Sequence, residues 1–166
     1  MIRFCDINRL NSVGHKPHYQ RHHLIPRQAG AESDFRCVFQ VLADDGFNLE
    51  DFGRNGILLP SCEKEAMRTG RPLHRAPHPL YNEIVMKRLS RISKLGDRFD
   101  DLAQRQNFIR FRFSLLQSSL RSGLNKGRFS KIYLSSRDPL RSGVRFDRMD
   151  SRIDQINRAT SLPNLD

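Results

Sequence analysis

Residues 19–26 read YQRHHLIP, and this short run is the part of the chain that decides the fold. It is typical of a strand, which must end at Pro26 because proline has no backbone N–H to donate to a sheet. Neighbouring residues on a strand point to opposite faces, so His22 and His23 cannot both be simple ligands of one metal ion. The pattern indicates unequal roles, in which one imidazole binds a metal and the other acts as a general base.

A second pair of histidines, His74 and His78, lies four residues apart in a loop that spans residues 71–79. On a helix this spacing would place both imidazoles on one face, as in many paired metal ligands. The three prolines of the loop disfavour a regular helix through His74. Pro79 suits the first turn of the next helix, so His78 is expected at that helix's N-terminus. His78 is therefore the better placed ligand, and the part played by His74 stays open.

Turn-forming and apolar residues predict the elements between the two histidine pairs. Ser33 is expected to cap a helix that runs to about Ala43. The dipeptide Asn55-Gly56 predicts a tight turn, followed by a strand over residues 57–59 that Pro60 closes. Ser61 is expected to cap a short helix that ends at Thr69-Gly70.

Two long amphipathic helices are predicted downstream of the second histidine pair. Apolar residues recur at helical spacing from Leu80 to Leu95, and Gly96 is expected to be the joint between the two helices. A second helix is expected from about Asp97 to Arg121, with Gly123 as its C-terminal cap. The apolar stripes of these helices are interpreted as core or as a partner-binding face. From residue 122 onward the only strand-like run is Ile132 to Leu134.

The charge of the chain points to an anionic partner. The 166 residues carry a formal net charge of +11, and residues 71–166 hold 20 basic and 9 acidic side chains. Nucleic acid is the commonest partner of such a protein, while an acidic protein, an anionic membrane and a merely solvated basic surface are the alternatives. The length suits one domain with one modest core.

Cysteine content and hydropathy limit the class of protein further. The three cysteines are widely spaced, which disfavours both a disulfide framework and a zinc ribbon. The N-terminus lacks the apolar run of a signal peptide, and no stretch approaches the roughly 20 apolar residues that a membrane span needs. The sequence predicts a cytoplasmic protein, or one exported without a cleaved signal peptide, and no membrane partner.

Three blocks of sequence together resemble a known family. They are RHHLIP at residues 21–26, NGILLP at 55–60 and HRAPHPLYN at 74–82. In this order they resemble the AHH group of nucleases, within the HNH or His-Me finger (ββα-metal) endonuclease superfamily. The resemblance covers about residues 18–95 and extends more loosely to about residue 121. Arg21 stands where the family name expects alanine, and Ala76 stands where glycine is common; both are flanking positions.

The resemblance implies an α+β fold, with a ββα-metal core and two long amphipathic helices packed beside it. It implies a nuclease domain over residues 1–121, with a catalytic core at about 18–95 and a helical extension to about 121. Residues 122–166 are then a basic, Ser/Arg-rich C-terminal extension, for which partial disorder is expected.

The resemblance also implies residue roles. His22 would be a metal ligand, His23 the general base that activates water, His78 the second ligand and His74 the third. Asn55 would structure its loop or orient the base. The family usually works with Mg²⁺ or Mn²⁺, whereas a site built of imidazoles favours Zn²⁺ or Ni²⁺ on affinity.

The expected activity is metal-dependent, endonucleolytic hydrolysis of DNA with little sequence specificity, DNA being favoured over RNA as substrate. The nucleic acid is expected to contact Arg21, Arg75, Lys87, Arg88 and Arg91. A bacterial toxin effector with an acidic immunity protein is one setting for such an enzyme. The alternatives are an RNase toxin and a non-catalytic basic nucleic-acid-binding module with a structural metal.

Overall fold

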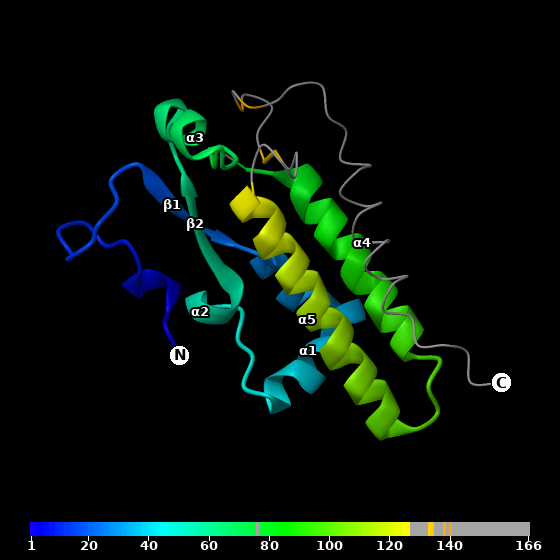
Figure 1. The fold of residues 1–166 in the computed structure, drawn as a ribbon. Coiled ribbons are helices and arrows are strands. Elements are labelled where there is room, and N and C mark those ends of the chain that lie inside the picture. Colours follow the sequence, from blue (N-terminus) through cyan, green and yellow to red (C-terminus); the bar gives the residue numbers. More distant parts are fainter. Residues whose placement is uncertain (76, 127–132, 135–137, 139, 141–166) are drawn as a thin grey trace.

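The computed structural model describes residues 1–75, 77–126, 133–134, 138 and 140. The main elements, in chain order, are β1 (Tyr19–His23), α1 (Arg36–Asp44), α2 (Phe52–Asn55), β2 (Gly56–Pro60), α3 (Glu63–Thr69), α4 (Pro79–Gly96) and α5 (Leu102–Lys126). Short 3₁₀ helices cover Phe4–Asp6, Arg27–Ala31 and Ser33–Phe35. Figure 1 shows the two-stranded hairpin at one end of the long helices α4 and α5, which is the expected α+β arrangement of a ββα-metal core.

The strands β1 and β2 pair antiparallel, with Tyr19 opposite Pro60 and His23 opposite Gly56. The segment that joins them is long and contains α1 and α2, so Asn55-Gly56 is not a tight turn and that prediction is wrong. Asn55 is the last residue of α2, and Gly56 begins β2 with a φ of −114°, outside the left-handed region. Gly56 is needed for close approach instead, because a Cβ there would lie 2.2 Å from a ring atom of Phe52.

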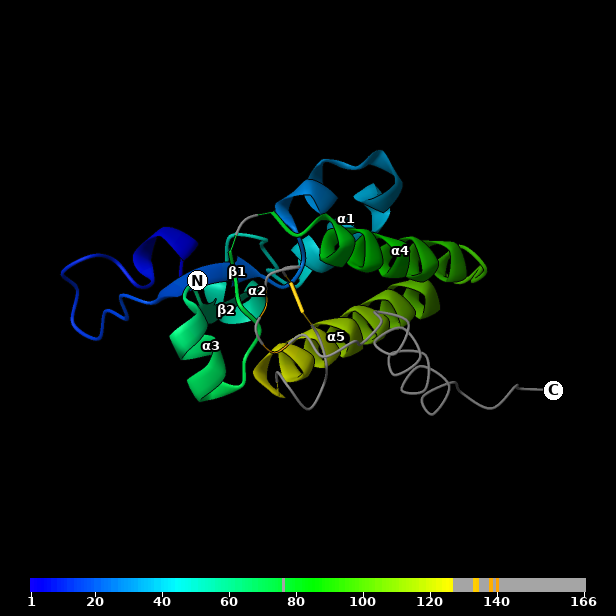
Figure 2. The same ribbon diagram turned by 90° about the horizontal axis from the view of Figure 1, so that it is seen from above.

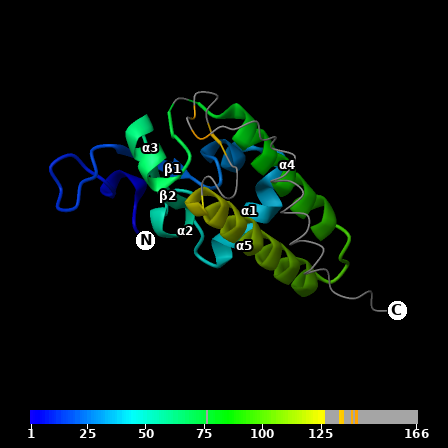
Figure 3. The same cartoon turned by 45° about the horizontal axis from the view of Figure 1, so that its top comes forward.

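The two long helices lie side by side, and α1 packs against both of them (Figures 2 and 3). Their shared core is apolar and its members recur three or four residues apart along each helix, which is the spacing of one helical face. The buried residues include Tyr81, Ile84, Val85, Leu89 and Ile92 of α4, and Ile109, Phe113, Leu116, Leu120 and Leu124 of α5. Gly96 ends α4 as expected, and a Cβ there would lie 3.2 Å from Ile109.

Several predicted boundaries need correction. Helix α5 begins at Leu102 rather than near Asp97, because the Asp101 carboxylate accepts a hydrogen bond from the Gln104 backbone N–H at 2.7 Å and so caps the helix there. It passes through Gly123 to Lys126 rather than stopping at Arg121, since Leu124 continues the buried stripe.

The helix expected after Ser61 also starts differently. Cys62 is the residue that precedes α3, and no side chain caps it. The Ser61 backbone N–H donates to the His18 carbonyl at 2.8 Å, so Ser61 extends the hairpin. The helix ends at Thr69 as predicted, with Gly70 in the left-handed region at a φ of 66°.

Most of the predicted C-terminal extension lies outside the described residues. Tyr133 and Leu134 are buried but do not form a strand, and Ile132 is outside the described part. Asp138 is also buried, and its carboxylate accepts a hydrogen bond from the Leu73 backbone N–H at 2.8 Å. None of the helices within the described residues has the length and hydropathy that a bilayer crossing requires.

Candidate active site

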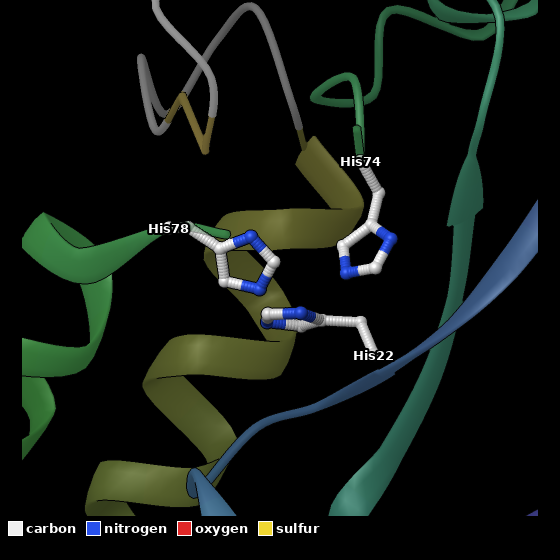
Figure 4. A group of neighbouring side chains, drawn as sticks. All are labelled: His22, His74 and His78. Atoms are coloured by element: carbon white, nitrogen blue, oxygen red, sulfur yellow. The ribbon is translucent and has the colours of Figure 1, made fainter. Parts of the chain in front are cut away.

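The structure brings together three histidines that are far apart in the sequence. The ring nitrogens of His22, His74 and His78 that could bind a metal lie within 4.8 Å of one another. Figure 4 shows the three imidazoles facing each other, with His22 on β1, His74 on the loop that follows α3, and His78 just before α4. The ring centroids are 4.7 to 5.0 Å apart. The predicted metal ligands therefore converge, His74 included.

Each of the three histidines is positioned by its local structure. His22 is 2% exposed and packs edge-on against Tyr81, whose hydroxyl donates to the Leu24 carbonyl at 2.8 Å. The His74 backbone N–H donates to the Pro60 carbonyl at 2.7 Å, which ties the loop to the end of β2. His78 is the N-cap of α4, with Pro79 in the first turn as predicted. The geometry of the three-histidine group thus depends on both strands and on the start of α4.

Gln20 orients His74. Its side-chain oxygen lies 3.0 Å from His74 Nδ1, so a proton on Nδ1 completes the hydrogen bond and leaves Nε2 free for a metal. Gln20 was not identified for this role from the sequence. A signal was present, because Gln20 is two residues before His22 and shares its face of the strand.

The surroundings keep His22 and His74 uncharged. Burial, together with the neighbouring His74 and His78, lowers the pKa of His22 well below its ordinary value. Burial and then the charge of His78 lower the pKa of His74 to about 4. Neutral imidazoles retain the nitrogen lone pair that a metal needs.

The donor set fits a divalent metal ion. His22 Nε2 is buried and makes no hydrogen bond, which is costly for a ring nitrogen unless another partner takes it. Three histidine ligands leave coordination positions open for water and substrate, as in catalytic metal sites. His22, His74 and His78 are therefore the residues that would hold the ion.

His23 has different surroundings from His22, its neighbour in the chain. Its ring stacks on Phe4, with centroids 3.6 Å apart and planes at 6°. Its Nε2 lies 3.6 Å from a carboxylate oxygen of Glu50. Burial lowers the pKa of His23, and the Glu50 carboxylate opposes that shift. Strand alternation thus separates His23 from the three-histidine group, as the sequence predicts.

Asn55 is fully buried and bonds to main-chain groups. Its side-chain oxygen accepts from the Ile25 N–H at 2.9 Å, and its amide donates to the carbonyls of Ile25 and Leu49 at 3.0 Å each. These contacts join the chain after β1 to the chain before β2. Of the two roles expected for Asn55, they fit the one that structures the loop.

The basic residues expected to bind nucleic acid are placed differently from one another. Arg21 donates to the Phe4 carbonyl at 2.6 Å, and Arg88 is 8% exposed. Arg75 is exposed and pairs with Glu63 at 3.7 Å, while Lys87 is exposed and pairs with Glu83 at 2.6 Å. Arg91 is exposed on α4. Of the five, Arg88 is buried, whereas Arg21, Arg75, Lys87 and Arg91 are exposed.

Comparison with models of known protein families identifies a match. A family model described as a nuclease family of the HNH/ENDO VII superfamily with conserved AHH matches residues 6–110. No curated protein and no solved structure matches the chain.

Proposed function

This chain belongs to the AHH nuclease family of the HNH/endonuclease VII superfamily, and from that premise we propose that it is a metal-dependent endonuclease that hydrolyses DNA with little sequence specificity. One observation carries the proposal. His22, His74 and His78 converge within 4.8 Å, while His23, adjacent in the chain, lies outside this group. A nuclease of this kind needs both a metal site and a separate general base. The three-histidine group is the proposed metal site, and His23 is the proposed base.

His23 is the proposed general base, which takes a proton from the attacking water. A positioned base of this kind contributes about 10²–10⁴-fold to the rate. A divalent ion held by the three histidines would supply Lewis-acid polarisation of the scissile phosphate and charge neutralisation at the departing oxygen. Mg²⁺ or Mn²⁺ is the proposed working ion, and Zn²⁺ or Ni²⁺ the tighter binder on ligand chemistry.

The charges around the site support an approach of the substrate from the side of His74. Arg75 directly follows His74 and is exposed, and a phosphate would replace Glu63 as the partner of its guanidinium, from which Glu63 is 3.7 Å away. A groove on the side of His78 is lined by three carboxylates, those of Glu32, Asp34 and Glu83. Because carboxylates repel phosphate, the backbone of the substrate is expected to avoid this groove.

Cleavage of supercoiled plasmid tests the proposal. The parent protein should nick DNA with Mg²⁺ or Mn²⁺ and stop when EDTA is added. His23→Ala should lower the rate by about 10²–10⁴-fold while metal binding is retained. If His23→Ala and the parent cleave at equal rates, His23 is not the general base. Parallel reactions with single-stranded DNA and RNA decide the substrate, and an RNA preference would replace the DNA assignment.

A toxin role with an acidic inhibitor stays a prediction. If the protein is a toxin, cells that express the parent protein should grow slowly, and cells that express His23→Ala should grow normally. Co-expression of a cognate acidic protein should restore growth in the first case. Equal growth of both strains would contradict the toxin role without affecting the nuclease assignment.

A further inference from the structure

The face of β1 that carries His23 is covered by residues 2–4, here called the N-terminal strap. Phe4 of the strap is 6% exposed and lies parallel to the imidazole of His23 at a centroid distance of 3.6 Å. Phe4 also meets Phe52 edge-on at 5.1 Å. The strap precedes residue 6, where the match to the family model begins, so this contact is made from outside the matched region.

The strap is anchored by main-chain hydrogen bonds to residues 50–52. The Phe4 N–H donates to the Glu50 carbonyl at 3.2 Å, and the Phe52 N–H donates to the Ile2 carbonyl at 2.6 Å. Arg3 forms an antiparallel bridge with Asp51 between these two bonds. Arg21 adds a further bond to the Phe4 carbonyl at 2.6 Å. The ring of Phe4 is thus held against His23 by a fixed backbone.

Glu50 lies at the edge of the same imidazole. One carboxylate oxygen of Glu50 is 3.6 Å from His23 Nε2 and 2.8 Å from Arg27 Nε. Arg27 therefore restrains the carboxylate that faces Nε2. His23 Nε2 is itself buried, so bulk water does not reach it, although 21% of the side chain as a whole is exposed. At 3.6 Å the contact with Glu50 is longer than a hydrogen bond, so it is an electrostatic contact between the ring edge and the carboxylate.

These contacts distinguish the two nitrogens of His23. A neutral imidazole carries one N–H donor and one lone-pair acceptor. A carboxylate beside Nε2 favours the proton on that nitrogen, which leaves the lone pair on Nδ1. A ring stacked on Phe4 cannot turn freely to exchange the two nitrogens.

We propose that Phe4 and Glu50 are positioning residues for His23, holding its Nε2–H toward Glu50 so that Nδ1 accepts the proton of the attacking water. This inference rests on the proposed function. In the step, the water oxygen forms a bond to phosphorus and its proton passes to Nδ1. The bond from phosphorus to the departing oxygen breaks, and that oxygen keeps the electron pair. The imidazolium that forms has its Nε2–H toward the Glu50 carboxylate, which stabilises the new charge.

Nuclear magnetic resonance of the ¹⁵N-labelled, metal-free full chain tests the tautomer directly. Long-range ¹H–¹⁵N correlations at mildly alkaline pH should show His23 protonated on Nε2 in the parent. Glu50→Gln should shift His23 toward a mixture of tautomers, because an amide can donate as well as accept. Glu50 is 42% exposed, so this variant should fold. Asp100→Asn, an exposed carboxylate between α4 and α5, is the control and should leave His23 unchanged.

Kinetics provide a second readout. Glu50→Gln and Phe4→Leu should each lower kcat by about tenfold to a hundredfold, with KM and metal affinity within about twofold of the parent. Phe111→Leu, in an exposed position on α5, is the control for loss of an aromatic ring. A parent protein protonated on Nδ1, or an unchanged tautomer in Glu50→Gln, would overturn the proposal. So would a rise in kcat in Phe4→Leu, because the strap would then cover the base.

The two proposals fail separately. If the parent cleaves no nucleic acid, the proposed function is wrong, yet the resonance experiment still decides whether Glu50 sets the tautomer of His23. If the parent cleaves and His23 is unaffected by Glu50→Gln, the nuclease assignment stands and the positioning role is overturned.

Discussion

Single residues show how adjacent positions acquire separate chemistry. His22 and His23 share a strand, yet His22 meets two other histidines and Tyr81, whereas His23 meets Phe4 and Glu50. The alternation of a strand separates the two rings, and the neighbours decide what each ring can do. Gln20 follows the same alternation: it lies on the face of His22, and there it contacts His74.

Gln20→Ala should weaken metal binding without unfolding the protein. The substitution removes the oxygen that lies 3.0 Å from His74 Nδ1, so the ligand ring is no longer held in one orientation. We expect affinity for Mn²⁺ or Zn²⁺, measured by titration calorimetry, to fall by about tenfold to a hundredfold. Gln40→Ala, on the exposed face of α1, is the matched control. Equal affinities for the two variants would exclude an orienting role for Gln20.

Asn55→Ala should strongly destabilise the fold. It leaves the Ile25 N–H and the carbonyls of Ile25 and Leu49 without their side-chain partner in a buried position. We expect the free energy of unfolding in urea to fall by about 2–4 kcal/mol. Asn107→Ala, in an exposed position on α5, should change it by less than about 0.5 kcal/mol. A small effect at Asn55 would contradict its role in joining the two loops.

At the scale of elements, the start of α4 carries one of the proposed metal ligands, His78, while the rest of the helix packs in the core. Pro79 begins the helix directly after His78, so the ligand takes its position from the helix end. The apolar face of α4 then packs on α5 and α1. Packing along the helix therefore holds His78 opposite the hairpin that carries His22.

Two leucines of α4 differ in burial, so replacing each by alanine distinguishes the contribution of core packing from that of helix propensity. Leu89 is fully buried, whereas Leu80 is 47% exposed. Leu89→Ala should lower the free energy of unfolding by about 2–5 kcal/mol through lost burial and the cavity left behind. Leu80→Ala should change it by less than about 1 kcal/mol. Thermal and urea denaturation measure both, and similar values would mean that α4 does not pack as described.

For the molecule as a whole, the three-histidine group links elements that are distant in the chain. Its three members, which are the proposed metal ligands, come from β1, from the loop after α3 and from the start of α4. An ion that binds only the folded protein stabilises it, and this stabilisation depends on ion concentration.

Metal removal should therefore lower the melting temperature. At an ion concentration 100 times Kd, binding adds about 2.7 kcal/mol to the stability of the folded state. Calorimetry of the parent should show a higher Tm with Mn²⁺ or Zn²⁺ than with EDTA. His74→Ala should lose most of that difference, while Arg91→Ala, an exposed change on α4, should retain it. If the Tm of the parent is the same with the ion and with EDTA, the proposed metal site is wrong.

The sequence by itself determined those features of the fold and of the site that depend on local pattern and on spacing along the chain. Strand alternation separates His22 from His23, Pro79 marks the start of α4, and apolar periodicity marks both long helices. The sequence predicted element boundaries and turns less reliably where burial competes with a local signal. Leu124 carries α5 past Gly123, and buried hydrogen bonds place Asn55 in a helical turn rather than in a tight turn.

Tertiary structure alone decided which distant groups meet. His74 joins His22 and His78 because its backbone bonds to Pro60 and its ring to Gln20. Strand alternation places Gln20 on the face of His22, but it does not indicate which distant loop residue meets that face. The same holds for Phe4 and Glu50, which reach His23 from segments without a motif. Local patterns act through neighbouring dihedral angles, whereas the surroundings of an imidazole are set by chain segments that only folding brings together.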